Sequence, residues 1–141
     1  RGRLAATELE FLSKKLEKKP KPFAMIAMHH HSVPMGSKWL DTMLVDNSKE
    51  LFNCLSHYEQ VKLMVTGHVH QVMETEKQGI KILSVPACCF QFKPKCKDFE
   101  LDCLSPGYRI IKLHTDGKIE SKIHRLEEPQ PELQSNSGGY K

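Results

Sequence analysis

The sequence lacks any long hydrophobic run. Its longest clearly apolar stretch, residues 23–28, has six residues, whereas a membrane-spanning helix needs about 20. We therefore expect no membrane span. The first residues, Arg1 to Leu4, lack the apolar core of a signal peptide, and the chain does not begin with methionine. These features predict that the 141-residue chain is a fragment or a trimmed form of a longer protein.

Aromatic residues are also few, and neither sign of charge is in large excess. Aromatic residues make up 7% of the chain, and 21 basic residues stand against 17 acidic ones, for a net charge of +4. This balance is too mild to predict a nucleic-acid partner, and the aromatic residues do not interleave with the basic ones. Hydrophobic residues at 39% and charged residues at 27% are typical of one ordinary globular domain rather than of a disordered chain.

Cysteines with a functional spacing are absent as well. The chain has five cysteines, an odd number, and no two of them have the CxxC spacing of a zinc site or a redox motif. We expect reduced thiols in a cytoplasmic protein, with no catalytic role for Cys88, Cys89 or Cys96. The other two cysteines are Cys54 and Cys103.

The first half of the chain predicts a strand–helix–strand unit. The expected elements, in chain order, are a helix from a capping box at Thr7–Glu10 to the prolines at 20 and 22, a buried strand at 23–28, a helix capped by Asn47 or Ser48, and a strand at 61–66. Two strands joined by a helix in this order are expected to be parallel, with a right-handed crossover. The connection over residues 29–47 is too long for an ordinary loop and is therefore expected to be functional.

The second half predicts hairpins. Antiparallel strands are expected at residues 71–76, 81–85, 108–114 and 118–126, with turns at 77–79 and 115–117. Between the two hairpins, residues 86–107 lack clear periodicity and are predicted to form a structured loop. Residues 127–141 contain prolines and glycines and predict a tail that lies over the surface or is disordered.

Two clusters of histidines come directly after the two strands of the predicted parallel unit. They are His29-His30-His31 and, in the segment Thr66-Gly67-His68-Val69-His70, His68 and His70. Because parallel strands end at the same edge of a sheet, we expect the clusters to converge there. Neutral imidazole is the commonest ligand of transition metals, and Gly67 allows the tight turn that such a site needs. The clusters therefore predict a metal site, whereas the isolated His57, His114 and His124 are expected to have no functional role.

The sequence around these histidines resembles a known enzyme family. Gly67-His68-Val69-His70 resembles the GHxH motif that closes the signature of the calcineurin-like metallophosphoesterases, and Met28–Pro34 resembles their earlier histidine motif. Further segments are similar to the bacterial 3′,5′-cyclic-AMP phosphodiesterase branch: Pro34–Asp41, Gln91–Pro94, Pro106–Arg109 and Gly139-Tyr140. The resemblance covers nearly the whole chain.

This resemblance implies a fold and a set of site residues. The fold is α/β: residues 1–126 would form the C-terminal half of a four-layer αββα sandwich with a mixed sheet. Two divalent metal ions (iron, manganese or zinc) would lie at the junction of the two sheets in the full-length enzyme. His29 and His68 would bind one metal and His70 the other, with His29 preferred because it stands at the strand end. His30 and His31 are the candidates to face the phosphate, and the register within the triplet stays open.

The implied activity is hydrolysis of 3′,5′-cyclic AMP to 5′-AMP, in which the metals neutralise the phosphodiester and lower the pKa of a bridging water that attacks phosphorus. The family's DxH, GD and GNH motifs, which supply the bridging aspartate, an asparagine ligand and the histidine that assists the leaving group, are absent from the sequence. We therefore expect the chain to be the C-terminal half of the enzyme and inactive by itself. We also expect it to self-associate as a symmetric dimer, through the apolar sheet face, or the edge of the unit formed by residues 23–28 and 61–66, that the other half would cover.

Two alternatives stay open. The first is a phosphodiesterase for another substrate, such as a glycerophosphodiester, although the loop around Trp39 and Gln91–Pro94 favour the cyclic-AMP branch. The second is a non-catalytic metal-binding or regulatory module, which the three absent motifs favour.

Overall fold

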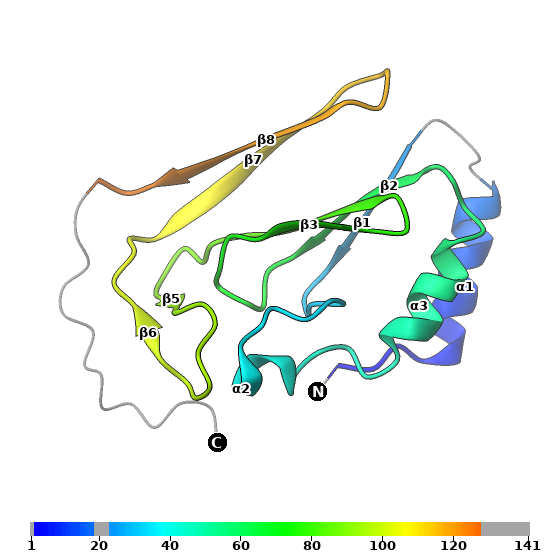
Figure 1. Ribbon diagram of the computed structural model, residues 1–141. Coiled ribbons are helices and arrows are strands. Elements are labelled where there is room, and N and C mark those ends of the chain that lie inside the picture. The colour runs from blue at the N-terminus through cyan, green and yellow to red at the C-terminus, as the bar shows by residue number, and fades with distance from the viewer. Residues whose placement is uncertain (1, 19–22, 128–141) are drawn as a thin grey trace.

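The chain folds around one central sheet, with two helices on one side and a hairpin on the other (Figure 1). The computed structural model describes residues 2–18 and 23–127, and its α/β architecture is the class expected from the sequence. The elements, in chain order, are α1 (Ala6–Lys18), β1 (Ala24–Met28), α2 (Lys38–Asp41), α3 (Ser48–Leu55), β2 (Val61–Thr66), β3 (Glu74–Lys77), β4 (Ile80–Ser84), β5 (Gln91–Phe92), β6 (Leu101–Asp102), β7 (Gly107–Leu113) and β8 (Ile119–Arg125).

The central sheet has four strands in the order β1-β2-β4-β3. β1 and β2 are parallel, with Met28 opposite Thr66 at their carboxyl ends, which confirms the predicted parallel unit. β3 and β4 form an antiparallel hairpin whose turn residues, Gln78 and Gly79, have φ of 53° and 74°, the left-handed conformation that a two-residue turn requires. β4 also lies parallel to β2, a pairing that the sequence did not predict. The sheet is therefore mixed, as expected.

α1 and α3 pack on one face of this sheet and form the main hydrophobic core with it. α3 buries Leu51, Phe52 and Leu55, whose spacing puts them on one side of the helix. They belong to the same core as Met64 of β2 and Ile82 of β4, both fully buried. No helix in the described ranges is long and apolar enough to span a membrane.

The predicted start of α1 is wrong in register. The helix begins at Ala6, so Thr7 lies inside it rather than at its cap. The carboxylate of Glu8 accepts a hydrogen bond from the backbone N–H of Ala5 at 2.6 Å, the contact that the capping box assigned to Glu10. The prolines expected to stop the helix lie outside the described residues.

β1 is an edge strand with one open face, so the expectation of a strand buried on both sides is wrong. Its residues alternate between half-buried and exposed, and Met25 is 45% exposed. Ile26 belongs to the core with the helices, whereas Met25 lies on the opposite face, beside the tip of the hairpin formed by β7 and β8. That hairpin covers only part of the face, which leaves the rest of β1 uncovered (Figure 1).

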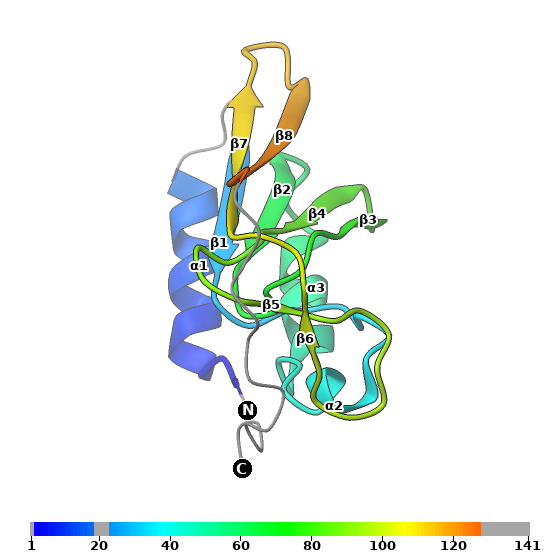
Figure 2. The same cartoon turned by 90° about the vertical axis from the view of Figure 1, so that its left-hand side faces the viewer.

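β7 and β8 form a separate antiparallel hairpin, paired from Gly107 and Arg125 to Leu113 and Ile119, which confirms the second predicted hairpin. Figure 2 shows the tip of this hairpin at the top of the molecule, above β1 and β2. Its turn at Gly117 packs against Phe23, and a Cβ at position 117 would lie 2.7 Å from that ring. Beyond Glu127, the predicted tail lies outside the described residues.

The two long connections form a second, smaller core. Residues 29–47 contain α2, and the predicted loop at 86–107 contains the short antiparallel strands β5 and β6. Leu40, Val69 and Phe92 are buried in this core, and Trp39 packs edge-on against Phe92 with 5.1 Å between ring centroids. The ring of His70 stacks on the same Phe92, so this core borders the histidines.

Candidate functional site

The carboxyl ends of β1 and β2 bring the two histidine clusters together. His29 follows Met28, the last residue of β1, and Gly67 follows Thr66, the register partner of Met28 in β2. The carbonyl of His29 accepts hydrogen bonds from the N–H of His68 at 3.0 Å and from the Thr66 hydroxyl at 2.6 Å. Backbone pairing therefore sets the distance between the clusters.

Four of the five predicted site histidines line one open cavity of about 330 Å³. They are His29, His30, His68 and His70, and Met43 and Phe92 complete the wall. Nε2 of His29 lies 3.1 Å from Nδ1 of His68, and the ring of His30 stacks on that of His68 with 4.4 Å between centroids. The roles of these side chains as ligands or phosphate-facing groups stay predictions.

His68 lies at the centre of the cluster. Burial first, and then the neighbouring histidines beginning with His30, lower the pKa of its imidazole to about 4. Its Nε2 is buried and has no hydrogen-bond partner within the described part of the chain. The ring is therefore neutral at pH 7, the form of histidine that binds metals.

His70 is held on two sides. Its Nδ1 lies 3.1 Å from the carbonyl oxygen of Phe90, and its ring stacks on Phe92 at 4.4 Å and an interplanar angle of 5°. Because a carbonyl oxygen only accepts, Nδ1 carries the proton in this contact, which leaves the lone pair of Nε2 available to a ligand. Burial lowers the pKa of His70, while the contact with Phe90 opposes the shift.

His31 is the predicted site residue that does not line the cavity. Its side chain is fully buried, and its Nε2 lies 3.6 Å from Oδ1 of Asp41. The Asp41 carboxylate accepts hydrogen bonds from the N–H groups of Met35 at 2.7 Å and Gly36 at 3.1 Å. Burial lowers the pKa of His31, and the nearby Asp41 opposes this effect. A phosphate-facing role for His31 stays a prediction, and of the pair only His30 reaches the cavity.

The sequence did not assign Asp41, Met43 or Phe92 to the site. Asp41 and Met43 come from the long connection after β1, and Phe92 comes from β5, so no periodic pattern links them to the histidines. Asp41 and Phe92 stand in segments that carry the family resemblance, which is the one signal that could have found them.

The other histidines and the cysteines lie away from the cavity. His114 pairs with Glu120 at 3.5 Å, and His124 stacks on Tyr108 with 5.2 Å between ring centroids. All five cysteines are free, and none lines the cavity.

The residues present fit part of a metal centre. Across residues 2–18 and 23–127, no group of three histidine, cysteine, aspartate or glutamate side chains has the arrangement of a complete metal site. Imidazole nitrogens are nevertheless ligands that zinc, iron and other transition metals take. Nε2 of His68 is buried without a partner among the described residues, and the ring of His29 is in contact with that of His68. Among the described residues, the cavity therefore offers imidazoles but no carboxylate to a metal.

Comparison with known proteins gives the family context of this site. No protein-family model matches the chain. The chain is 37% identical over 139 residues to the 3′,5′-cyclic adenosine monophosphate phosphodiesterase CpdA of Escherichia coli, which covers 99% of the chain and 50% of the relative. It is 38% identical to CpdA of Haemophilus influenzae, covering 99% of the chain and 51% of the relative. It is 36% identical to a 3′,5′-cyclic-nucleotide phosphodiesterase of Nostoc, covering 89% of the chain and 47% of the relative.

A solved structure supports the fold. The crystal structure of a dimetal phosphatase from Danio rerio matches with a TM-score of 0.56 at 16% identity, covering 88% of this chain and 37% of that one. The match shows that the described fold is similar to part of the fold of that phosphatase. The chain spans about half the length of the curated relatives that it matches. Over that half, it is homologous to the bacterial CpdA 3′,5′-cyclic adenosine monophosphate phosphodiesterases.

Proposed function

We propose that this chain is the C-terminal half of a calcineurin-like metallophosphoesterase that hydrolyses 3′,5′-cyclic AMP to 5′-AMP. Homology to CpdA over half of its length supports the family and the substrate class. The observation that carries the proposal is the contact between His29 and His68 across the ends of two parallel strands, 3.1 Å between ring nitrogens. Residues 1–126 would belong to one αββα domain, completed by a half that this sequence does not contain.

Within this proposal each histidine has a position that suits its role. His29 and His68 would hold one divalent metal, since their rings are in contact and His68 has an unpartnered nitrogen. His70 would hold the other through Nε2, because its Nδ1 is committed to the Phe90 carbonyl. His30 lines the same cavity and would face the phosphate.

When bound, two metals would supply positive charge to the phosphodiester and lower the pKa of a water. The chain's own contribution is to keep its imidazoles neutral and oriented. Burial does the first by lowering the pKa values of His68, His70 and His30. Stacking on Phe92 and backbone contacts do the second for His70.

The experiment is turnover of cyclic AMP by the longer protein, measured as release of 5′-AMP. We expect His68→Ala to abolish turnover nearly completely, whereas His57→Ala, an exposed histidine outside the cavity, keeps it. Normal turnover by His68→Ala would contradict the proposal. The isolated 141-residue chain is expected to be inactive, and metal-dependent hydrolysis by that chain would overturn the requirement for a carboxylate from the other half.

One alternative has a specific observation in its favour. The sequence lacks the DxH, GD and GNH motifs, so by itself it could bind but not turn over a substrate, which suits a non-catalytic metal-binding or regulatory module. Finding the DxH, GD and GNH motifs upstream in the parent reading frame would exclude this module. A panel of diesters that includes a glycerophosphodiester then decides between the two classes of substrate.

A further inference from the structure

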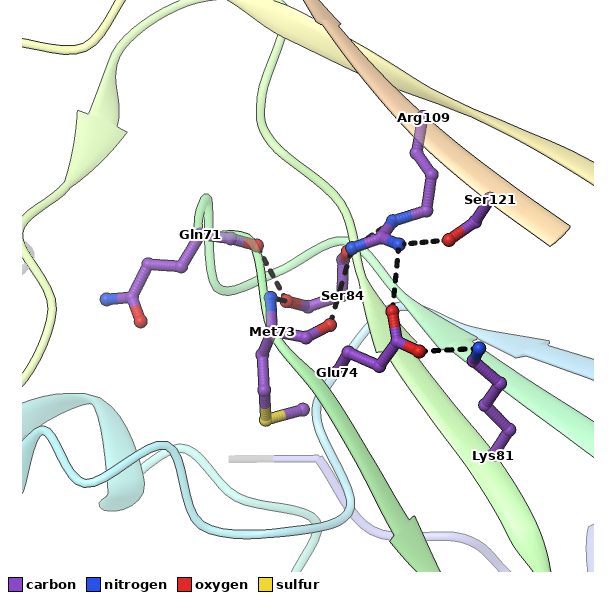
Figure 3. A network of polar contacts seen from close by, with 7 residues as sticks. All are labelled: Gln71, Met73, Glu74, Lys81, Ser84, Arg109 and Ser121. Atoms are coloured by element: carbon purple, nitrogen blue, oxygen red, sulfur yellow. Dashed lines mark hydrogen bonds and ion pairs between the residues drawn. The ribbon is translucent and has the colours of Figure 1, made fainter.

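Arg109 of β7 is a buried cation that joins the hairpin to the central sheet (Figure 3). Its side chain is 3% exposed. The guanidinium donates hydrogen bonds to the carbonyl of Ser84 at 3.0 Å, the hydroxyl of Ser121 at 2.7 Å and the carbonyl of Met73 at 3.4 Å. Glu74 lies 3.9 Å away. Burying a charge is costly unless it is paired and hydrogen-bonded, and the planar fork of arginine satisfies several acceptors at once.

Ser84, the last residue of β4, holds the segment that Arg109 also reaches. Its hydroxyl donates to the carbonyl of Gln71 at 2.6 Å and accepts from the N–H of Met73 at 2.7 Å. The backbone N–H of Ser84 donates to the carbonyl of Met73 at 3.0 Å. Figure 3 shows these contacts meeting at Ser84, below the guanidinium of Arg109. The segment from Gln71 to Met73 is therefore fixed to the end of β4.

Ser84 fixes both ends of the loop that carries His68 and His70, which spans residues 67–73. The loop begins after Thr66, which is the register partner of Ser84 in the parallel pair of β2 and β4. It ends at Gln71–Met73, which Ser84 holds directly, so both ends of the loop are fixed relative to the same residue. In its middle, His70 has φ of 48°, an uncommon conformation for a residue other than glycine. Such conformations persist only where the surrounding contacts determine them.

Resting on the proposed role of His68 and His70 as metal ligands, we propose that Arg109 and Ser84 are positioning residues of the site. They act through the backbone of residues 71–73, which keeps the loop closed and the two imidazoles directed into the cavity. The hairpin of β7 and β8 is thereby a structural support of the histidine site, although it lines no part of that cavity.

The first test observes the histidine rings directly, without any metal. In the ¹⁵N-labelled chain, we expect Arg109→Met to shift the imidazole resonances of His68 and His70 and to leave those of His57 unchanged. Ser84→Ala removes two of the loop contacts without changing the charge, and it is expected to shift the same two rings. Arg125→Met is the matched control, because Arg125 lies in the same hairpin and its guanidinium donates to Ser105 rather than to the loop. Arg109→Lys keeps the charge but not the planar fork of donors, and we expect it to shift the rings of His68 and His70 less than Arg109→Met does.

The second test titrates cobalt(II) alone into the same chains and records the affinity and the visible absorption spectrum. We expect Arg109→Met and Ser84→Ala to bind cobalt about 10- to 100-fold more weakly, the range found when partners of metal ligands are removed. Arg125→Met should bind as wild type does. A wild-type chain that binds no cobalt would contradict a metal site formed by the imidazoles of this chain alone, and the ring resonances would still decide whether the loop is positioned by Arg109.

Unshifted rings of His68 and His70 in both Arg109→Met and Ser84→Ala would overturn the inference. If Arg109→Met does not fold, Ser84→Ala decides alone, since it removes only a hydroxyl. Urea midpoints of all variants separate a local change in the loop from a general loss of stability.

Discussion

Replacing His68 by leucine tests what it costs the fold to keep an unsatisfied imidazole in the site. Nε2 of His68 is buried without a hydrogen-bond partner among the described residues, and an unsatisfied buried polar group costs about 1–3 kcal/mol. Leucine has no polar atom to bury. We therefore expect the free energy of unfolding of the metal-free His68→Leu chain at pH 7 to be about 1 kcal/mol higher than that of wild type, although the variant loses the proposed ligand.

The same substitution changes the dependence of stability on pH. The pKa of His68 is lowered from 6.5 to about 4 in the folded chain, so between these values the unfolded chain binds a proton that the folded chain does not. Lowering the pH through this interval therefore favours unfolding. The whole interval corresponds to about 3 kcal/mol. Because the ring is partly exposed to an open cavity, solvent screening reduces this value, and we expect about 1–2 kcal/mol.

The assay is urea unfolding in the presence of a chelator at about pH 7, 5.5 and 4.5. Trp39 is the single tryptophan and packs against Phe92 beside the site, so its fluorescence reports on this region. Wild type should lose more stability than His68→Leu as the pH falls, and His57→Leu should follow wild type. Equal losses in wild type and His68→Leu would refute the reasoning about the buried ring.

Other outcomes follow from single contacts. Gly107→Ala is expected to lower the free energy of unfolding by about 1–3 kcal/mol, because a Cβ there would lie 2.5 Å from the carbonyl oxygen of His124; an unchanged urea midpoint would contradict this. Cys89→Ala should keep the cyclic-AMP turnover of the longer protein, since Cys89 is exposed and does not line the cavity; loss of turnover in a stable variant is the opposing result. The isolated chain is expected to self-associate through its open sheet face, and a strict monomer in sedimentation would disprove it.

Local patterns were sufficient to predict the parallel unit and the convergence of the histidines. Residues 61–66 form a strand with the predicted bounds, and the strand at 23–28 differs only by its first residue. Their order around a helix determines that they are parallel, and parallel strands end at one edge. The closeness of His29 and His68 therefore follows from topology alone.

Contacts between distant segments account for what the sequence could not predict. Burial of His31 against Asp41 depends on how the long connection after β1 folds back, and stacking of His70 on Phe92 depends on the small hairpin of β5 and β6. The parallel pairing of β4 with β2 depends on which edge of β2 is free, and an alternating pattern carries no information about that. The predicted helix cap was wrong for a local reason. Glu8 and Glu10 both lie near the start of α1, and the residue at which the helix begins decides which carboxylate accepts the hydrogen bond from the N–H before the helix.

The open face of the sheet and the proposed metal site lie in one region of the molecule. An open groove of about 410 Å³ on the uncovered side of β1 and β2 is lined by Ala27, Val65 and His29, among others. His29 also lines the cavity that contains His68 and His70, so the groove and the site share this residue. A layer of structure packed on the uncovered face would therefore bring its own side chains next to the imidazoles that lack a carboxylate partner. The relatives are about twice as long as this chain, which leaves room for such a layer. On this reasoning the missing ligands and the missing cover for β1 are to be sought in the same segment, and a variant that fills the groove, such as Ala27→Trp, should block both association of that segment and turnover.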